Sequence, residues 1–227
     1  ARLKGSKNIL KFKYLYYNWF GEKNIGDIGF DFSKKPNRLK ILQETIDRKK
    51  YKSYLEIGCF RNELFGNIKC EKKVGVDPYF GGTIRKTSDE FFLTNKENFD
   101  LIFIDGLHMY FQAKKDILNS LKILNSDGVI MLHDCLPNNV YDQAIPRCKY
   151  IWNGDVWKAI VEFRTFEHLD VYTCYADFGI GVILKRKNRS RLIIQKKIFS
   201  KLKFYDYYNN YKQFMNIVEF DELNNLF

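Results

Sequence analysis

The sequence lacks any long uncharged apolar segment. No run of about eighteen uncharged apolar residues occurs, so the usual kind of transmembrane helix is excluded. No short apolar stretch follows a basic N-terminus, so a secretory signal peptide is not indicated. We therefore expect a cytoplasmic protein with no membrane span.

Paired cysteine motifs are also missing. The chain has five cysteines, an odd number, and no C-x-x-C spacing joins any of them: Cys59, Cys70, Cys135, Cys148 and Cys174. This pattern argues against a disulfide framework and against a structural zinc site. We expect reduced thiols.

Acidic residues are scarce at both ends of the chain. The balance of Lys and Arg over Asp and Glu is +9 for residues 1–52, −4 for 53–184 and +6 for 185–227. Such flanks suit RNA, an anionic membrane surface or a phosphorylated substrate, and a solvated basic surface is the simpler alternative. The charge alone does not identify which of these partners, if any, the flanks bind.

The central part of the chain alternates short apolar runs with helical segments. We predict strands at residues 54–57, 73–76, 101–104 and 129–132. Apolar residues at three- and four-residue steps predict a helix between the last two strands, ending near Asp127-Gly128. This pattern is typical of βαβ units, so we predict a Rossmann-like, doubly wound α/β core.

Helical segments flank this core. We treat residues 1–52 as an N-terminal helical extension, 53–186 as the core and 187–227 as a C-terminal helical tail of one globular domain. In the extension, Ser33 is the expected helix cap and Pro36 lies in the first turn.

Three further local patterns lie within the core. Residues 87–90 match a capping box that opens a short helix. A helix is expected at 155–163. Residues 171–175 and 179–184 are expected to form a final hairpin that closes the sheet.

A long irregular segment follows Asp134. It runs for about twenty residues to Gly154 with two prolines and no clear period, and such a loop is usually functional. We expect it to act as a lid. Arg147 and Trp152 are our candidates for acceptor contact, because a basic residue suits a diphosphate.

A strand that runs into one glycine marks a candidate cofactor site. Glu56 and Gly58 end the first strand, and Asp77 follows Gly58 by nineteen residues, at the end of the next strand. An acidic residue at about this spacing accepts hydrogen bonds from an adenosine ribose. The glycine-rich fingerprint of a dinucleotide site is missing. The motif therefore favours an adenosine cofactor whose cationic group suits Glu56, although a plain turn stays open.

Two acidic positions and two histidines follow the next two strand ends. Asp105 and His108 come after one strand, and the pair His133-Asp134 comes after the next. Consecutive parallel strand ends meet at one edge of a sheet, so these side chains should converge. Mixed oxygen and nitrogen ligands suit magnesium, manganese or iron, and His108 is a candidate general base. A turn at Asp105, a loop-bridging Asp134 and a structural His108 are the alternatives.

Four segments carry a resemblance to class I S-adenosylmethionine-dependent methyltransferases: Leu55-Glu-Ile-Gly58, Val76-Asp77, Phe103-Ile-Asp-Gly-Leu-His108-Met-Tyr110 and Gly128-Val-Ile-Met-Leu-His-Asp134. More narrowly, they resemble the small-molecule and sugar O-methyltransferases found with bacterial surface-polysaccharide and macrolide genes. The resemblance spans roughly residues 53–186, and the Asp-Gly-x-His-x-Tyr and His-Asp pairing is its most specific part. It implies a seven-stranded sheet whose last strand is antiparallel.

The resemblance also implies roles for single residues. We expect six residues to contact the cofactor S-adenosylmethionine: Glu56, Gly58, Cys59, Asp77, Asp105 and Gly106. A divalent metal, Mg²⁺, Mn²⁺ or Fe²⁺, is expected at Asp105, His133 and Asp134. His133 stands where some metal-dependent relatives have a carboxylate. Asp105, His108 and His133 form the expected catalytic group.

We therefore predict an O-methyltransferase that acts on a sugar hydroxyl, within a nucleotide sugar for bacterial capsule or O-antigen synthesis. Methyl transfer needs aligned reactants and removal of the hydroxyl proton, which this residue set can supply. Two alternatives stay open: an RNA methyltransferase that uses the basic flanks, and a metal-independent small-molecule methyltransferase. A homo-oligomer is compatible with the sequence, and nucleic acid is the less favoured partner.

Overall fold

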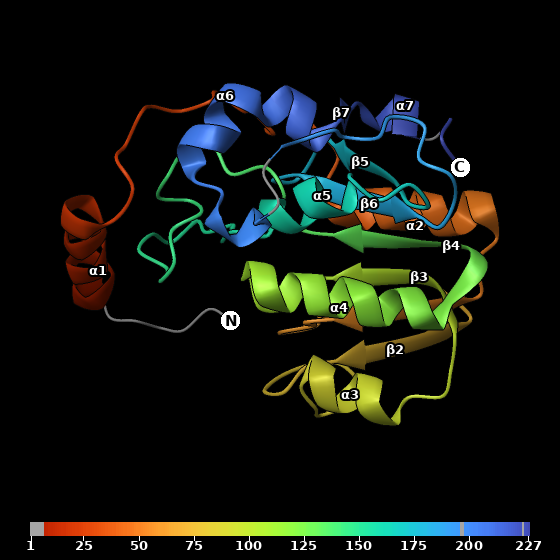
Figure 1. Cartoon of the computed structure of the whole chain (residues 1–227). Coiled ribbons are helices and arrows are strands. Elements are labelled where there is room, and N and C mark those ends of the chain that lie inside the picture. Colours follow the sequence, from red (N-terminus) through yellow and green to blue (C-terminus); the bar gives the residue numbers. More distant parts are fainter. Residues whose placement is uncertain (1–6, 196–197, 224) are drawn as a thin grey trace.

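The computed structural model describes residues 7–195, 198–223 and 225–227 (Figure 1). The first six residues of the predicted N-terminal extension, and positions 196, 197 and 224 of the predicted tail, lie outside this description.

One mixed sheet organises the described part of the chain. Its seven strands lie in the order β2-β1-β3-β4-β6-β5-β7. In chain order they are β1 (Ser53–Ile57), β2 (Lys72–Val76), β3 (Phe99–Ile104), β4 (Leu124–Leu132), β5 (Asp170–Cys174), β6 (Ile180–Leu184) and β7 (Ile217–Val218). The first four strands run parallel to one another.

The antiparallel strand is β6. It pairs antiparallel with both β4 and β5, so the predicted hairpin near Gly179 is present. The two-residue β7 then adds parallel to β5 at the edge of the sheet. The predicted Rossmann-like fold with a seven-stranded sheet is confirmed. The predicted antiparallel strand is β6, and the last strand in the chain, β7, is an edge strand contributed by the tail.

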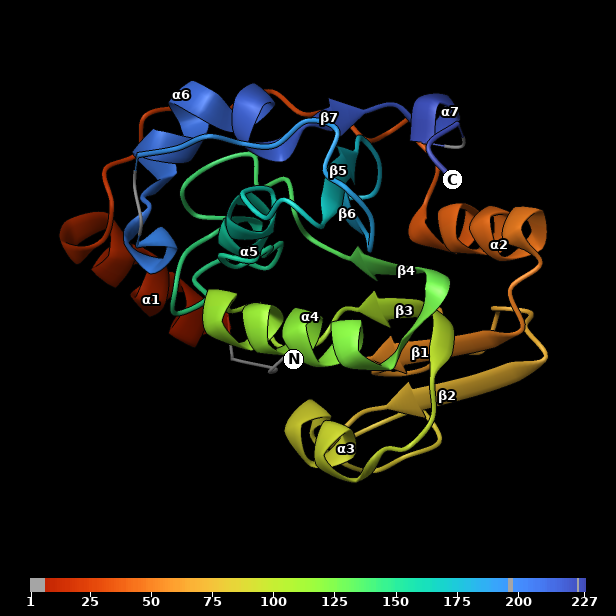
Figure 2. The ribbon, with the colours of Figure 1, turned by 45° about the vertical axis from the view of Figure 1, so that its right-hand side comes forward.

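Seven α-helices accompany this sheet within the described residues (Figures 1 and 2). They are α1 (Lys7–Phe20), α2 (Arg38–Lys49), α3 (Ser88–Thr94), α4 (Tyr110–Ile123), α5 (Trp157–Phe163), α6 (Phe204–Met215) and α7 (Phe220–Leu223). A short 3₁₀-helix spans Phe199–Lys201. None of these helices is long and apolar enough to cross a membrane.

The two faces of the sheet bury different helices because strand side chains alternate between faces. Leu55 and Ile102 share one apolar cluster with α4, α5 and α6. Tyr54 and Leu101, their chain neighbours, share the other cluster with α2 and α7. The parallel strands are therefore buried on both sides.

Two predicted helix boundaries are wrong. The helix α2 begins after Asn37, whose side chain accepts a hydrogen bond from the Lys40 amide, so Asn37 and not Ser33 is the cap. The helix α4 ends at Ile123, earlier than predicted, because Leu124 already pairs with Phe99 of β3. The capping box at Thr87 is confirmed.

Candidate active site

One glycine and three aspartates lie where the four parallel strands end. Gly58 follows β1, Asp77 follows β2, Asp105 follows β3 and Asp134 follows β4 by two residues. All four strands point the same way, so these positions share the carboxyl edge of the sheet. Ligands of open α/β sheets bind at this edge.

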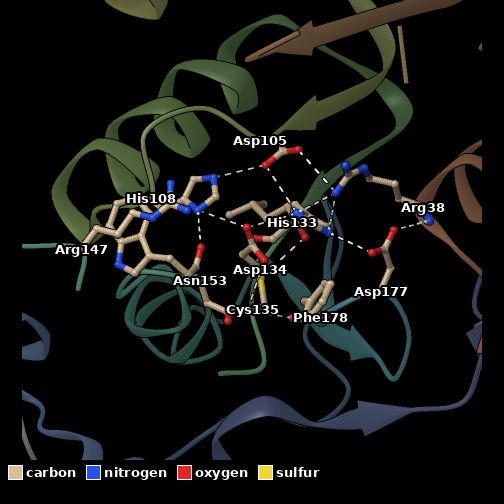
Figure 3. Close-up of polar contacts among 12 residues, drawn as sticks. Arg38, Asp105, His108, His133, Asp134, Cys135, Arg147, Asn153, Asp177 and Phe178 are labelled. Atoms are coloured by element: carbon tan, nitrogen blue, oxygen red, sulfur yellow. Dashed lines mark hydrogen bonds and ion pairs between the residues drawn. The ribbon is translucent and has the colours of Figure 1, made fainter. Parts of the chain in front are cut away.

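The two carboxylates and two imidazoles predicted to converge do so (Figure 3). Nε2 of His108 lies 3.3 Å from Asp105 Oδ1, and its Nδ1 lies 3.1 Å from Asp134 Oδ2. Nδ1 of His133 lies 3.4 Å from Asp105 Oδ1 and 3.2 Å from Asp134 Oδ2. We call these four residues the edge cluster.

The edge cluster has a donor set that fits a divalent cation. One ligand atom each from Asp105, His108 and Asp134 lies within 4.8 Å of the other two. Carboxylate oxygens with imidazole nitrogen suit magnesium, manganese or iron. His133, predicted from the sequence as the third ligand, contacts both carboxylates but is not part of this closest group, which contains His108 instead.

The protonation of the edge cluster follows from its opposite charges. Burial alone would raise the pKa of Asp105, but the imidazoles of His133 and His108 hold it well below its usual value. Burial alone would lower the pKa of His108, but Asp134 and Asp105 raise it. The imidazolium form of His108 is therefore favoured while both carboxylates face it.

Two charged residues that the sequence reasoning missed complete the cluster. Nη1 of Arg38, from the first turn of α2, lies 2.9 Å from His133 Nε2 and 3.7 Å from Asp105 Oδ2. Asp177 accepts a hydrogen bond from the Arg38 backbone amide at 2.7 Å and lies 3.4 Å from His133 Nε2. They lie far along the chain from Asp105 and His133, and no local motif marks them.

His108 is held by the loop that follows β4. The Trp152 indole stacks on the imidazole, with ring centroids 5.1 Å apart and planes 12° apart. The Trp152 carbonyl lies 3.1 Å from His108 Nδ1. A side chain on Gly154 would collide with the His108 backbone carbonyl, so the loop approaches closely here.

The backbone beside the edge cluster is strained. Asp134, Asp177 and Phe178 all have left-handed backbone, with φ of 62°, 41° and 62°. Such conformations cost about 1–3 kcal/mol each for residues other than glycine and cluster at functional sites. Asn153 supports Asp134 by donating a hydrogen bond to its Oδ1 at 3.2 Å.

The predicted cofactor contact Glu56 is almost completely buried. Its side chain lies on the same face of β1 as Tyr54, whose hydroxyl donates a 2.5 Å hydrogen bond to Glu56 Oε2. Burial raises the pKa of Glu56 to about 8, with a further increase from the charge of Asp105. A cationic group nearby would favour its ionised form.

Gly58 permits the close approach of β1 and β3 at their ends. Its φ is +92°, and a Cβ there would lie 2.2 Å from the Asp105 carbonyl oxygen. Asp105 in turn donates its backbone amide to the Ile57 carbonyl. Gly106 lies beside Ile57, while Cys59 is buried with its thiol directed at the Glu56 carbonyl.

Asp77 is occupied by its own loop. Its carboxylate accepts hydrogen bonds from three backbone amides, those of Phe60, Tyr79 and Phe80. It therefore shapes the turn that carries Gly58 as well as lying at the position expected for ribose contact. Ribose binding by Asp77 stays a prediction.

The predicted lid is largely packed against the protein. Residues 135–144 of this segment are buried apart from Asn138, whose side chain accepts the Gly29 amide. The Arg147 guanidinium donates hydrogen bonds to the backbone carbonyls of Lys149 and Tyr150. Contact of Arg147 and Trp152 with an acceptor stays a prediction.

A cavity of about 830 Å³ lies next to this loop. Three lysines line it, Lys23, Lys158 and Lys203, together with residues of α1. Asp155, also in its wall, pairs with Lys158 at 3.1 Å and accepts the backbone amide of Tyr110 at the start of α4. Asp155 therefore joins the cavity wall to the loop that holds His108, because it directly follows Gly154 and contacts the first residue of α4.

A sequence comparison gives the class of this site. Residues 50–135 match the family described as "Methyltransferase domain", a segment that runs from just before β1 to the residue after Asp134. This segment, which holds the four parallel strands, is similar to methyltransferase domains. No curated protein matches the chain at a significant level.

Two solved structures illustrate the fold that this chain shares. The cofactor-bound protein Rv0187 from MTB matches with a TM-score of 0.51 and 12% identity, covering 82% of this chain and 100% of that one. An O-methyltransferase from Bacillus cereus in complex with SAH matches with a TM-score of 0.50 and 13% identity, covering 81% and 94%. These structures confirm the predicted fold, and the family match to residues 50–135 supports the prediction of a methyltransferase.

Proposed function

We propose that this methyltransferase uses S-adenosylmethionine to methylate a sugar hydroxyl, with a divalent cation assisting and a nucleotide-linked sugar as the acceptor. The supporting observation is the edge cluster, where Asp105, His108, His133 and Asp134 meet at the carboxyl edge of a methyltransferase fold. The Bacillus cereus neighbour is an O-methyltransferase in complex with SAH.

The cofactor side of the site is the end of β1 and β2. Glu56 offers a buried carboxylate to a cationic group, Gly58 gives backbone access, and Asp77 offers its remaining lone pairs to ribose hydroxyls. Cys59 and Gly106 line the same turn, next to Asp105. Bound S-adenosylmethionine supplies the electrophilic methyl group.

The chain's own acid–base chemistry centres on His108. In this proposal, the neutral form of His108 takes the proton of the acceptor hydroxyl, and its imidazole is held in place by two carboxylates and a stacked indole. A cation held by Asp105 and Asp134 would favour this neutral form, because its charge offsets the carboxylates that otherwise favour the imidazolium. Asp105 orients the imidazole through Nε2, and His133 contacts the same oxygen of each carboxylate as His108 does. Positioned proton transfer of this kind contributes about 10²–10⁴-fold in rate.

Asp105 and Asp134, with the imidazole of His133, would hold Mg²⁺, Mn²⁺ or Fe²⁺, which leaves His108 for proton transfer. Such an ion lowers the pKa of a bound hydroxyl and orients it. Arg147, Trp152 and the three lysines of the neighbouring cavity are the candidates for binding the phosphate-bearing part of the acceptor. Transfer to a surface-polysaccharide precursor is the biological setting we propose.

An RNA acceptor is the second candidate. Its basis is the charge of +9 in residues 1–52 and +6 in residues 185–227. It predicts RNA binding that weakens steeply as salt rises.

Calorimetric titration of chelator-treated protein tests the proposal. S-adenosylhomocysteine is titrated with and without Mn²⁺, Mn²⁺ is titrated alone, and NAD and a short RNA serve as competing ligands. We expect S-adenosylhomocysteine to bind and Asp134→Ala to abolish Mn²⁺ binding. The matched control is Asp127→Ala, which removes an exposed carboxylate from β4, the strand that precedes Asp134, and should change neither result.

Each negative result has a defined meaning. Binding of NAD without S-adenosylhomocysteine would overturn the proposed cofactor. Binding of S-adenosylhomocysteine with no Mn²⁺ binding would leave a metal-independent methyltransferase. Salt-dependent RNA binding, with no transfer to nucleotide sugars, would favour the second candidate.

A further inference from the structure

The first helix turns a row of large apolar side chains away from the protein. Five of them form what we call the outer face of α1: Phe12, Leu15, Tyr16, Trp19 and Phe20. Phe12, Trp19 and Phe20 are 70%, 79% and 74% exposed. Exposed aromatic side chains gathered on one helix are unusual on a protein that binds nothing there.

The opposite side of α1 holds the helix on the protein. Tyr17 is its one fully buried side chain among those described. Tyr14 packs on Tyr141 with ring centroids 4.6 Å apart, and Asn18 accepts a hydrogen bond from the Tyr141 hydroxyl. At 100° per residue, Phe12, Tyr16 and Trp19 point away from Tyr14 and Tyr17, so the outer face stays exposed when the helix packs on the protein.

The charged residues of α1 itself are all lysines. Residues 1–21 contain five basic residues and no acidic one. On the helix itself, Lys11 and Lys13 fall on opposite borders of the outer face at the helical spacing. An apolar face with Trp, Tyr and Phe between lysines is the pattern of a helix that lies in the interface of an anionic membrane.

The position of α1 relates this face to the candidate active site. In both views the arrowheads of β2, β3 and β4 point toward the side of the molecule where α1 lies (Figures 1 and 2). Tyr17 and Phe20 of α1 also line the 830 Å³ cavity beside the loop that holds His108. The outer face therefore lies on the same side as the carboxyl edge of the sheet.

We propose that the outer face of α1 binds the surface of an anionic lipid bilayer and holds the carboxyl edge of the sheet toward it. The apolar side chains would enter the boundary between headgroups and acyl chains, while Lys11 and Lys13 would contact anionic headgroups. If the function proposed above holds, this orientation places its acceptor site next to the bilayer surface.

A second copy of the chain fits this face less well. A two-fold contact sets the same patch against itself. Two copies of α1 would bring Lys11 and Lys13 toward their own counterparts, and the helix has no acidic residue to pair with them. Anionic headgroups supply the missing negative charge.

Vesicle co-sedimentation of the whole chain tests the proposal. The probes are vesicles of phosphatidylcholine alone and of phosphatidylcholine mixed with phosphatidylglycerol, at low and high salt. We expect binding to the mixed vesicles that weakens as salt rises. The double variant Phe12→Ser/Trp19→Ser should lower the partition coefficient by about tenfold or more, because two large rings lose their burial in lipid.

Two further variants separate the contributions. Lys11→Glu/Lys13→Glu should remove the preference for phosphatidylglycerol. The matched control is Leu93→Ser, which removes an 86% exposed aliphatic side chain from α3 and should leave binding unchanged. All these side chains are at the surface, so thermal unfolding should show that each variant is folded.

Any one of three results would overturn the proposal. These are no binding to mixed vesicles, equal binding by the outer-face variant, or a lipid-free dimer that the same variant dissociates. The last would assign the face to a second copy. Calorimetry with S-adenosylhomocysteine on the same samples keeps this outcome separate from failure of the proposed methyltransferase chemistry.

Discussion

The Trp152 indole lies stacked on the His108 imidazole, and the Trp152 backbone carbonyl faces Nδ1 of the same ring. Trp152, in the loop after β4, therefore orients the His108 ring with its side chain and contacts one ring nitrogen with its backbone carbonyl. From the sequence, Trp152 was expected to contact the acceptor. Its observed partner is the candidate base itself, so its removal should act on catalysis through His108.

We expect Trp152→Ala to lower the rate of methyl transfer to a nucleotide-sugar acceptor by about two- to tenfold, because a stacked aromatic pair contributes about 0.5–1.5 kcal/mol. Trp152→Phe should retain most of the rate. NMR of the histidine rings should show the His108 signal moving in Trp152→Ala, whatever the acceptor. Trp19→Ala, which removes an exposed indole, is the control, and an unchanged His108 signal would contradict the assigned contact.

Burial of Glu56 should make the stability of the protein depend on pH. The pKa of Glu56 is raised from 4.5 to about 8 in the folded protein. The folded state therefore holds this proton more tightly than the unfolded state does. The resulting stabilisation is complete below the unfolded pKa and is lost as pH rises through the folded pKa.

Glu56→Gln should remove this dependence, because an amide does not ionise. We expect the unfolding free energy of the wild type, minus that of Glu56→Gln, to fall by a few kcal/mol between about pH 5 and about pH 8, since one pKa unit corresponds to about 1.4 kcal/mol. Urea unfolding across this range measures it. A difference that does not change with pH would show that Glu56 is ionised in the folded state.

Gly58→Ala should damage both stability and cofactor binding. The new Cβ would lie 2.2 Å from the Asp105 carbonyl oxygen, and the φ of +92° is unfavourable for any side chain. We expect a loss of about 1–3 kcal/mol in stability from backbone strain, with a further loss from the collision. Affinity for S-adenosylhomocysteine should fall because the end of β1 must move.

Gly29→Ala separates strain from collision. Gly29 has a similar φ of +89°, but its Cβ would meet nothing within 4 Å. This variant should lose stability through strain alone and keep its affinity for S-adenosylhomocysteine. Equal losses of affinity in the two variants, measured by calorimetry, would rule out the close approach of Gly58 to Asp105 as the cause.

The sequence predicted what local patterns determine. The parallel strands were found because each is a short apolar run bounded by polar residues, and the edge cluster followed because consecutive parallel strands end at one edge. The end of α4 was misplaced because Leu124 fits the helical spacing equally well, and its pairing with Phe99 decides the matter. Boundaries set by tertiary pairing leave no signal in a local pattern.

Arg38 shows the same limit at the site. Its guanidinium reaches His133 across 95 positions of the sequence. Nothing around position 38 distinguishes it from the other basic residues of the extension, because the contact depends on where α2 packs against the sheet. Asp177, in the turn between β5 and β6, was missed for the same reason.

Arg38 should compete with a divalent cation for the edge cluster. Its guanidinium lies 3.7 Å from Asp105 Oδ2, a candidate metal ligand, and two charges about 4 Å apart interact by several kcal/mol in a partly buried site. We expect Arg38→Gln to bind Mn²⁺ about tenfold more tightly. It should also lose about 1–3 kcal/mol of stability in chelator, because the carboxylates lose a charged partner.

The control is Lys40→Gln, which removes a 60% exposed cation from the same helix and should leave both quantities unchanged. Calorimetry measures the Mn²⁺ affinity, and urea unfolding with and without Mn²⁺ measures the stability. Added Mn²⁺ should restore much of the stability that Arg38→Gln loses, because the ion would take the place of the lost positive charge. A fall in Mn²⁺ affinity would instead mean that Arg38 holds Asp105 and His133 in position for the ion.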